Sequence, residues 1–421
     1  MAARIPLTGL DRERGSDLDG EEAATGPSHF IGRLQFLYPA SQGLPQTFHL
    51  MAPGSGSKLG GQEENPLCTQ APLLHCHLHA VGGLKGLNSL YLNFTLSQYN
   101  EIYIFGKKFL NFQLSLSGSL GIACAENANG THEWIINNFF RFMAQFNYSD
   151  FTELNKNFSG FEVLDLLSPQ QLSGLTVNSD ALNNTDKISQ ILNTFTSRSF
   201  SDLVAYFTQF IHDTQSVGIT AIQNTTVRDT ILSIIIKLLE PQFPTFNTSD
   251  YIDWFQTRLH LLLPSITGNE LNTIPTNITC KSYQAIVKGL DKLYPDLSTT
   301  QQEDIYNFIV KYLTRQLDST ASACTARTIG STVWLLNNFG RFRSFITYRN
   351  LTALNKNFIG LDAVKFLTVS QLGELAGNNG TLRNADDVRK IFRDITSATV
   401  TEFINTFSTA VNQVGDYFNQ F

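Results

Sequence analysis

The chain has 421 residues, a net charge of −6 at pH 7 and a pI near 5.8. Charged residues make up 16% of it, below the usual quarter, whereas Phe, Asn, Ser and Thr are abundant. This composition offers no basic surface for nucleic acid and no polybasic segment for anionic lipid, so both kinds of partner are excluded. A largely uncharged polar surface is typical of a glycosylated exterior.

The first 75 residues differ in kind from the rest of the chain. They contain a Gly-Ser-Gly-Ser-Lys-Leu-Gly-Gly run at 54–61 and an acidic run at 17–22. The run at 54–61 lacks the residue order of a phosphate-binding loop and is better explained as a flexible linker. We expect residues 1–75 to be disordered or unrelated to the remainder. No secretory signal is visible at the amino terminus.

Helical patterns follow in chain order. Ser168 before Pro169 is typical of a helix start, since proline has no amide hydrogen to leave unbonded there. Apolar residues after Asp186 and Asp386 recur at helical spacing. The stretch from Ile231 to Leu239 is interrupted by polar residues and is far shorter than the ~20 residues that cross a bilayer, so it predicts a buried helix and not a membrane span.

Two further helices are predicted in the second half. Residues 250–263 are apolar at helical spacing before Pro264, which we expect to end the run. Ile305, Phe308 and Tyr312 follow the same spacing after a capping box formed by Ser298 and Gln301. Sustained alternation typical of strands is not found, and the sequence therefore predicts an all-α protein.

The chain is similar to itself at an offset of 200 residues. About a third of the positions from Cys124 to Phe207 are identical to their counterparts, including Leu-Asn-Lys-Asn-Phe-x-Gly at 154–160 and 354–360. With three residues inserted, the match extends upstream, where Lys85-Gly-Leu corresponds to Lys288-Gly-Leu. We infer an internal duplication, with a first unit over 76–279 and a shorter second unit over 280–421, and we expect the chain to be a fragment of a longer array. Reiterated short helices predict a superhelical, armadillo-like stack.

The cysteines follow the duplication. Each unit has one cysteine near its start and another about 45 residues later, which predicts the disulfides Cys76–Cys124 and Cys280–Cys324 and leaves Cys68 over. The alternative is five unpaired thiols in a cytosolic protein.

Ten Asn-x-Ser/Thr sequons occur, a modest excess over the number that this Asn-rich composition gives by chance. At Asn157 a capped turn is the better explanation. The other nine are predicted glycosylation sites: Asn93, Asn129, Asn147, Asn183, Asn224, Asn247, Asn277, Asn350 and Asn379.

Signals for metal binding or catalysis are weak. His75, His77 and His79 would share one face of an extended segment, but the second unit has no counterpart, so we expect neither metal nor cofactor. The carboxylates Glu153 and Asp165 are also not retained in the second unit, so no catalytic dyad is predicted and a non-enzymatic protein is expected. The repeated Trp134/Trp334 and Arg141/Arg341 could anchor a ligand, although a tryptophan that fills the core and an arginine that solvates it are the simpler explanation.

Three runs, at 167–175 (LSPQQLSGL), 262–275 (LLPSITGNELNTIP) and 278–290 (ITCKSYQAIVKGL), give a resemblance to a known group. They resemble the mesothelin, stereocilin and otoancorin family, and the similarity extends over residues 85–421. The resemblance implies glycosylated surface proteins with armadillo-like superhelical folds that act in cell adhesion or attach extracellular gels to epithelium. The signal peptide and lipid-anchor tail of that family are not found in this sequence.

These patterns together favour an extracellular or cell-surface scaffold or adhesion module that binds protein or glycan. The alternative is a glycosylated structural component of the extracellular matrix, which associates with itself and has no discrete ligand site.

Overall fold

The computed structural model describes residues 87–88, 90–115, 130–317, 324, 330–378 and 380–418, and in these residues it contains helices and turns and no strand. Contacts divide the chain at residues 65 and 66, and every described residue belongs to the unit Pro66–Phe421. The all-α class predicted from the sequence is confirmed for the described part of the chain.

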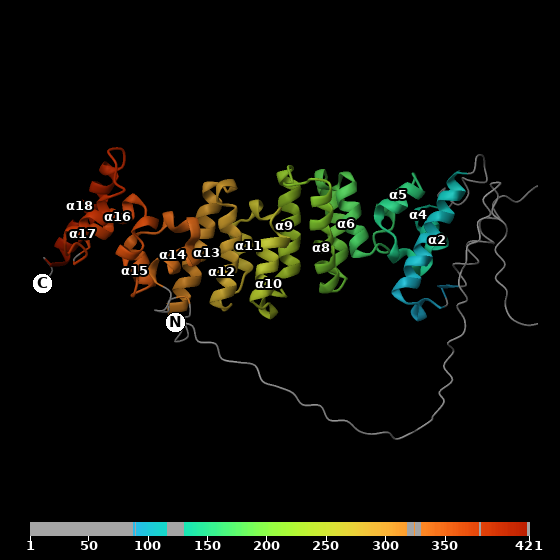
Figure 1. Cartoon of the computed structure of the whole chain (residues 1–421), viewed down its shortest axis with the longest axis horizontal. Coiled ribbons are helices and arrows are strands. Elements are labelled where there is room, and N and C mark those ends of the chain that lie inside the picture. The colour runs from blue at the N-terminus through green and yellow to red at the C-terminus, as the bar shows by residue number, and fades with distance from the viewer. Residues whose placement is uncertain are drawn as a thin grey trace, which may run out of the picture. The chain divides into compact units, whose positions relative to one another are not determined.

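Short α-helices in chain order build this unit (Figure 1). They are α2 (Leu96–Ser115), α4 (Thr131–Phe139), α5 (Tyr148–Leu154), α6 (Pro169–Asn178), α7 (Thr185–Asn193), α8 (Phe200–Ser216), α9 (Thr225–Leu239), α10 (Thr248–Asp253), α11 (Gly268–Thr273), α12 (Cys280–Lys292), α13 (Thr299–Leu317), α14 (Ser331–Phe339), α15 (Tyr348–Leu354), α16 (Val369–Gly377), α17 (Ala385–Phe392) and α18 (Val400–Phe418).

Single turns of 3₁₀-helix connect many of the α-helices. They are η2 (Tyr91–Asn93), η3 (Phe140–Gln145), η4 (Gly160–Glu162), η5 (Asp180–Asn183), η6 (Thr194–Thr196), η7 (Phe243–Thr245), η9 (Leu263–Ser265), η10 (Tyr294–Asp296), η11 (Gly340–Phe345), η12 (Gly360–Asp362) and η13 (Val364–Phe366), and η8 (Trp254–Arg258) is a π-helical turn.

Side-chain caps fix where the helices begin. Ser168 and Thr368 each form a capping box with the glutamine three residues later, so that two otherwise unbonded amides are satisfied at the start of α6 and α16. Ser298 and Gln301 bond to each other's amides before α13 in the same way. The predicted helix starts at Ser168 and Ser298 are therefore confirmed.

The predicted apolar helices form, and α7 and α9 bury their apolar faces, whereas Val388 and Phe392 of α17 are exposed. α7 and α17 both occur where the repeated pattern places them, and each begins after a capping asparagine, Asn184 or Asn384. The stretch 231–239 lies in α9 and buries most of its aliphatic side chains. No helix among the described residues is both long enough and apolar enough to cross a bilayer.

The helix predicted over 250–263 is divided. α10 ends at Asp253, and the π-helical turn η8 follows it directly. Pro264 does not end this run but stands in the first turn of η9, where its missing amide hydrogen costs nothing. α12 approaches this segment so closely that a side chain at Gly289 would overlap the carbonyl oxygen of Phe255. Local periodicity cannot reveal such an approach, because it depends on a neighbouring helix.

The most extensive contacts between helices join helices two places apart along the chain. α6 contacts α8, α7 contacts α9, α10 contacts α12, α11 contacts α13, and α16 contacts α18. The core between them is rich in aromatic side chains, such as Trp134, Phe139, Phe151 and Phe158, whose rings lie edge to face or tilted. Contacts between near neighbours are those expected of stacked helical units.

The stretches matched at an offset of 200 contain the same series of elements. α4, η3, α5, η4, α6, α7 and α8 in the first stretch correspond to α14, η11, α15, η12, α16, α17 and α18 in the second, with starting residues 200 apart.

The two stretches also share their buried hydrogen bonds. Gln171 Nε2 donates to the carbonyl oxygens of Met143 and Phe146, both at 2.7 Å. Gln371 Nε2 donates to the equivalent carbonyl oxygens, at 2.7 and 2.6 Å. Asn138 and Asn338 each donate to the carbonyl oxygen of the tryptophan four residues earlier, at 2.8 Å.

The backbone after α4 and α14 adopts a conformation that favours glycine. Gly340 has φ 53° and ψ −131°. Phe140 has almost the same angles, φ 50° and ψ −134°, although it has a side chain. The shared turn is thus retained in the first stretch at the cost of backbone strain.

Candidate functional site

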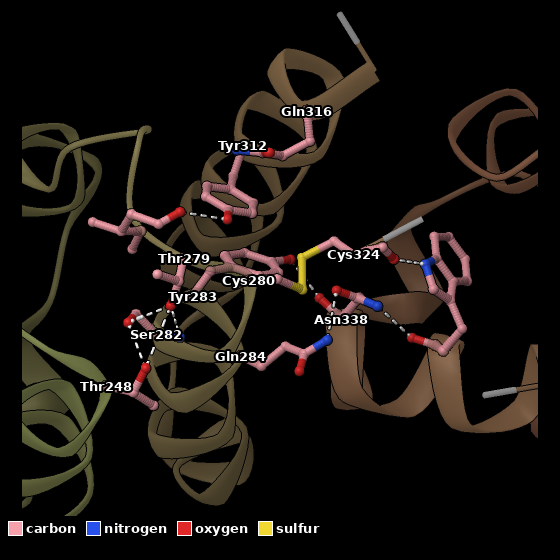
Figure 2. The surroundings of a disulfide bond; sticks show 12 residues. Thr248, Thr279, Cys280, Ser282, Tyr283, Gln284, Tyr312, Gln316, Cys324 and Asn338 are labelled. Atoms are coloured by element: carbon pink, nitrogen blue, oxygen red, sulfur yellow. Dashed lines mark hydrogen bonds between the residues drawn. A yellow bond between two sulfur atoms is a disulfide. The ribbon is translucent and has the colours of Figure 1, made fainter. Parts of the chain in front are cut away.

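The disulfide between Cys280 and Cys324 is the chemically distinctive feature of the described residues (Figure 2). The two Cα atoms lie 5.3 Å apart, and the bond joins the first residue of α12 to a residue between α13 and α14. Cys324 is buried and Cys280 is partly exposed. The structure therefore joins this predicted pair, whereas Cys68, Cys76 and Cys124 lie outside the described residues.

Hydroxyl groups position the cysteine at the start of α12. Thr279 is the N-cap, and its hydroxyl accepts a hydrogen bond from the amide of Ser282. The hydroxyls of Thr248 and Ser282 are hydrogen-bonded at 3.0 Å, which ties the start of α10 to the start of α12 (Figure 2). The helix end that holds Cys280 is fixed by these contacts.

Buried polar side chains join the other side of the disulfide to α14. The indole N–H of Trp334 donates to the carbonyl oxygen of Cys324. Tyr283 O–H donates to the carbonyl oxygen of Asn338 at 2.6 Å, and Gln284 Nε2 donates to Asn338 Oδ1 at 3.3 Å (Figure 2). α12 is therefore linked to α14 by hydrogen bonds and to Cys324, which precedes α14 in the chain, by the covalent bond.

Two stacked tyrosines complete these surroundings. The rings of Tyr283 and Tyr312 lie 4.0 Å apart and almost parallel, and Tyr312 O–H donates to the carbonyl oxygen of Ile278 at 2.8 Å. Burial raises the pKa of Tyr283 well above its usual value and raises the pKa of Tyr312 to about 12. Both phenols stay neutral at physiological pH and act as hydrogen-bond donors.

This network was only partly visible in the sequence. The sequence Asn-Asn-Phe occurs at 137–139 and again at 337–339, and this repetition was the available signal for Asn338. The role of Asn338 as a link to Tyr283 and Gln284 depends on the packing of α12 against α14. The repeated tryptophans, Trp134 and Trp334, are buried, so the prediction that they fill the core is confirmed.

Most of the predicted glycosylation sites lie at the surface. Asn224 is half-buried, and Asn129 and Asn379 lie outside the described residues. The remaining six are exposed: Asn93, Asn147, Asn183, Asn247, Asn277 and Asn350.

Three of these sequons have a structural role that their motif does not indicate. Asn147, Asn224 and Asn247 are the N-cap residues of α5, α9 and α10. Asn224 also donates from Nδ2, the atom to which a glycan would be attached, to the carbonyl oxygen of Asn183 at 3.3 Å. Helix capping is therefore a sufficient reason for an asparagine at these three positions, without glycosylation. Asn183 and Asn277 are not N-cap residues; each is exposed and precedes a capped helix.

Of the residues behind the weak metal and catalytic signals, Glu153 and Asp165 lie in the described part of the chain. The histidines at 75, 77 and 79 lie outside it, and within it no group of three or more His, Cys, Asp or Glu side chains could hold a metal ion. Glu153 Oε2 lies 3.4 Å from Lys107 Nζ. The main partner of Lys107 is the buried carboxylate of Asp150. Hydrogen bonding to Asp150 raises the pKa of Lys107 to about 12, so this lysine is held as a cation in an ion pair.

Comparison with known proteins found no matching family model, no curated protein of significant similarity and no solved structure of significant similarity.

Proposed function

We propose that this chain is an extracellular or cell-surface helical repeat protein, non-enzymatic, which acts as an adhesion or scaffold module by binding protein or glycan partners. The observation that carries the proposal is the Cys280–Cys324 disulfide, because such bonds persist in oxidising compartments and are rare in the cytosol. Exposed sequons at Asn183, Asn277 and Asn350 support the same location.

The proposed architecture is a superhelical, armadillo-like stack made by duplication of one unit. Equivalent elements at the same offset, the equivalent glutamines Gln171 and Gln371, and the unusual backbone at Phe140 and Gly340 all favour a common origin for the two stretches. Stacked units of this kind present extended surfaces, which are suited to binding large partners. The resemblance to the mesothelin, stereocilin and otoancorin group points to the same kind of role and is part of this proposal.

Location and modification are tested on protein from its natural source. Peptide mapping without reductant is expected to recover Cys280 and Cys324 in one cross-linked fragment, and glycosidase treatment is expected to lower the mass of peptides containing Asn183 or Asn277. Free thiols at both cysteines together with unmodified asparagines would overturn the extracellular assignment.

Adhesion is tested with the oxidised, glycosylated full chain coated on a surface. Epithelial cells are expected to be retained above the level found with an albumin coating, and protein that has been denatured, reduced and alkylated is the unfolded control. Failure of the coated protein to retain cells or to bind arrayed glycans and extracellular proteins would refute the binding role. Self-association without such binding would favour the alternative, a structural matrix component.

A further inference from the structure

Three lysines form a row on the exposed side of α12. Lys281, Lys288 and Lys292 are separated by seven and four residues, and both spacings return a side chain to the same side of an α-helix. All three lysines are exposed. At a rise of about 1.5 Å per residue, the row extends over about 16 Å of the helix. We call these three residues the α12 lysine row.

The opposite side of α12 is firmly packed. Tyr283, Ile286 and Leu290 are fully buried there, and the hydrogen bond from Tyr283 to the carbonyl oxygen of Asn338 ties this side to α14. α12 also packs against α10, which precedes it in the chain. The α12 lysine row therefore remains exposed with helices from both directions of the chain packed around α12.

Neighbouring carboxylates leave the positive charge of the row uncompensated. None of its three lysines forms an ion pair or a hydrogen bond with another described residue. Asp291, the one acidic residue of α12, accepts a hydrogen bond from the amide of Arg341. At the neighbouring α10, Asp253 pairs with Arg258 at 3.4 Å and Asp250 takes part in the capping box.

α17 also has three exposed cations, but its local charge is different. Each cation is paired with an aspartate: Arg389 with Asp386, Lys390 with Asp387, and Arg393 with Asp394. Because a negative charge lies beside each positive one, the potential that α17 presents to a distant anion is small. The α12 lysine row is therefore distinguished by its net charge and not by its number of cations.

We infer that the α12 lysine row binds a linear anionic glycan that carries sulfate groups along its length. Such a chain can contact all three ammonium groups at once, which a single small anion cannot do over about 16 Å. No large hydrophobic residue of α12 is exposed, whereas stable protein interfaces depend on aromatic or aliphatic anchors. The spacing of seven and four residues forms no polybasic segment in the sequence, so the row exists only in the folded helix.

This inference rests on the glycan-binding part of the proposed function and names both the class of glycan and the site. Glycan binding that requires the α12 lysine row, without cell retention, would refute the adhesive role alone. Cell retention by a chain that does not bind the sulfated glycan would refute the α12 lysine row alone.

The probe is a fluorescent heparin oligosaccharide, added to the oxidised full chain. Saturable binding is expected, and it should weaken by about tenfold between about 50 mM and about 150 mM NaCl, because salt competes with three ionic contacts. Substitution of the whole row, Lys281→Gln, Lys288→Gln and Lys292→Gln, is expected to weaken binding by about tenfold or more at the lower salt concentration.

The matched control removes the same number of positive charges from α17. Arg389→Ser, Lys390→Gln and Arg393→Asn introduce the residues that α7 has at the equivalent positions, and are expected to change binding by less than about threefold. Circular dichroism checks that both variants are folded.

Four results would overturn the inference. They are the absence of saturable binding up to about 1 mM, wild-type affinity in the variant that lacks the row, and equal weakening in the α17 control, which would make net charge the cause. The fourth is displacement of the heparin probe by polyglutamate at an equal concentration of charge, because the partner would then be an acidic protein segment.

Discussion

Removal of the disulfide is expected to destabilise the region of α12 and α14 and to leave α6 and α8 unchanged. Cys280 and Cys324 are 44 residues apart, and closing a loop of this size lowers the entropy of the unfolded segment by an amount worth about 4 kcal/mol. The double variant Cys280→Ala and Cys324→Ala is preferable to serine, because Cys324 is buried and a hydroxyl there would need a partner. Loss of van der Waals contacts of the sulfur atoms adds a smaller cost.

Hydrogen exchange measured by mass spectrometry gives this effect segment by segment. A loss of about 3–4 kcal/mol corresponds to between two and three orders of magnitude faster exchange in α12 and α14. Helices α6 and α8 are the internal control, since stacked units transmit stability mainly to their neighbours. Reductant should reproduce the change in α12 and α14 of the wild type and should not alter exchange in these two helices of the double variant. Unchanged protection of α12 and α14, or an equal loss in α6 and α8, would refute the reasoning.

Three other outcomes are expected. Gln171→Ala and Gln371→Ala should each lower the free energy of unfolding by about 2–4 kcal/mol in urea titrations, because each removes two hydrogen bonds to backbone carbonyl oxygens. A large effect in only one variant would contradict equivalent roles. Gly340→Ala should lower the free energy of unfolding by about 2–3 kcal/mol, because φ at this position is positive and the new Cβ would meet Asp291. Phe140→Gly should change the free energy of unfolding by less than about 1 kcal/mol, because relief of backbone strain offsets the lost packing. Equal losses for the two variants would refute this account. The contribution of the buried tyrosines to the free energy of unfolding should be fully present below pH 10, the usual tyrosine pKa. It should be lost as the pH rises through the raised pKa of Tyr312, about 12, because the folded state disfavours the phenolate. Stopped-flow absorbance at 295 nm that shows Tyr283 and Tyr312 ionising before unfolding would contradict this expectation.

The sequence predicted those features that depend on neighbouring residues along the chain. Ser168, Ser298 and the apolar spacing of α7, α9 and α13 are local signals, and each helix formed where they indicate. The pairing of Cys280 with Cys324 was also predictable, because the two units repeat the spacing of their cysteines. By contrast, the break in the helix after Asp253 lies where α12 approaches closely at Gly289, and a pattern of apolar residues contains no information on such an approach.

The sequons show a second limit of sequence motifs. Asn147 and Asn247 each stand before a Ser at the second following position and an Asp at the third, and this order satisfies both a glycosylation motif and a capping box. The structure shows the capping role, since Oδ1 of Asn247 accepts backbone hydrogen bonds from Ser249 and Asp250.

Comparison of the two units indicates which residues maintain the fold and which are free to confer binding. The identical residues Gln171/Gln371, Asn138/Asn338 and Trp134/Trp334 are buried or hydrogen-bonded to backbone, so packing alone explains their repetition. The two matched stretches also differ in burial at one position: Asp150, which is buried and paired with Lys107, corresponds to Asn350, which is exposed and lies in a sequon. Under the proposed binding role, a partner that distinguishes one stretch from the other would contact exposed positions at which they differ, because a repeated core specifies stacking and not recognition. Substitutions at such exposed, unmatched positions should therefore alter binding without altering the free energy of unfolding, whereas substitutions at the repeated buried positions should alter stability in both units alike.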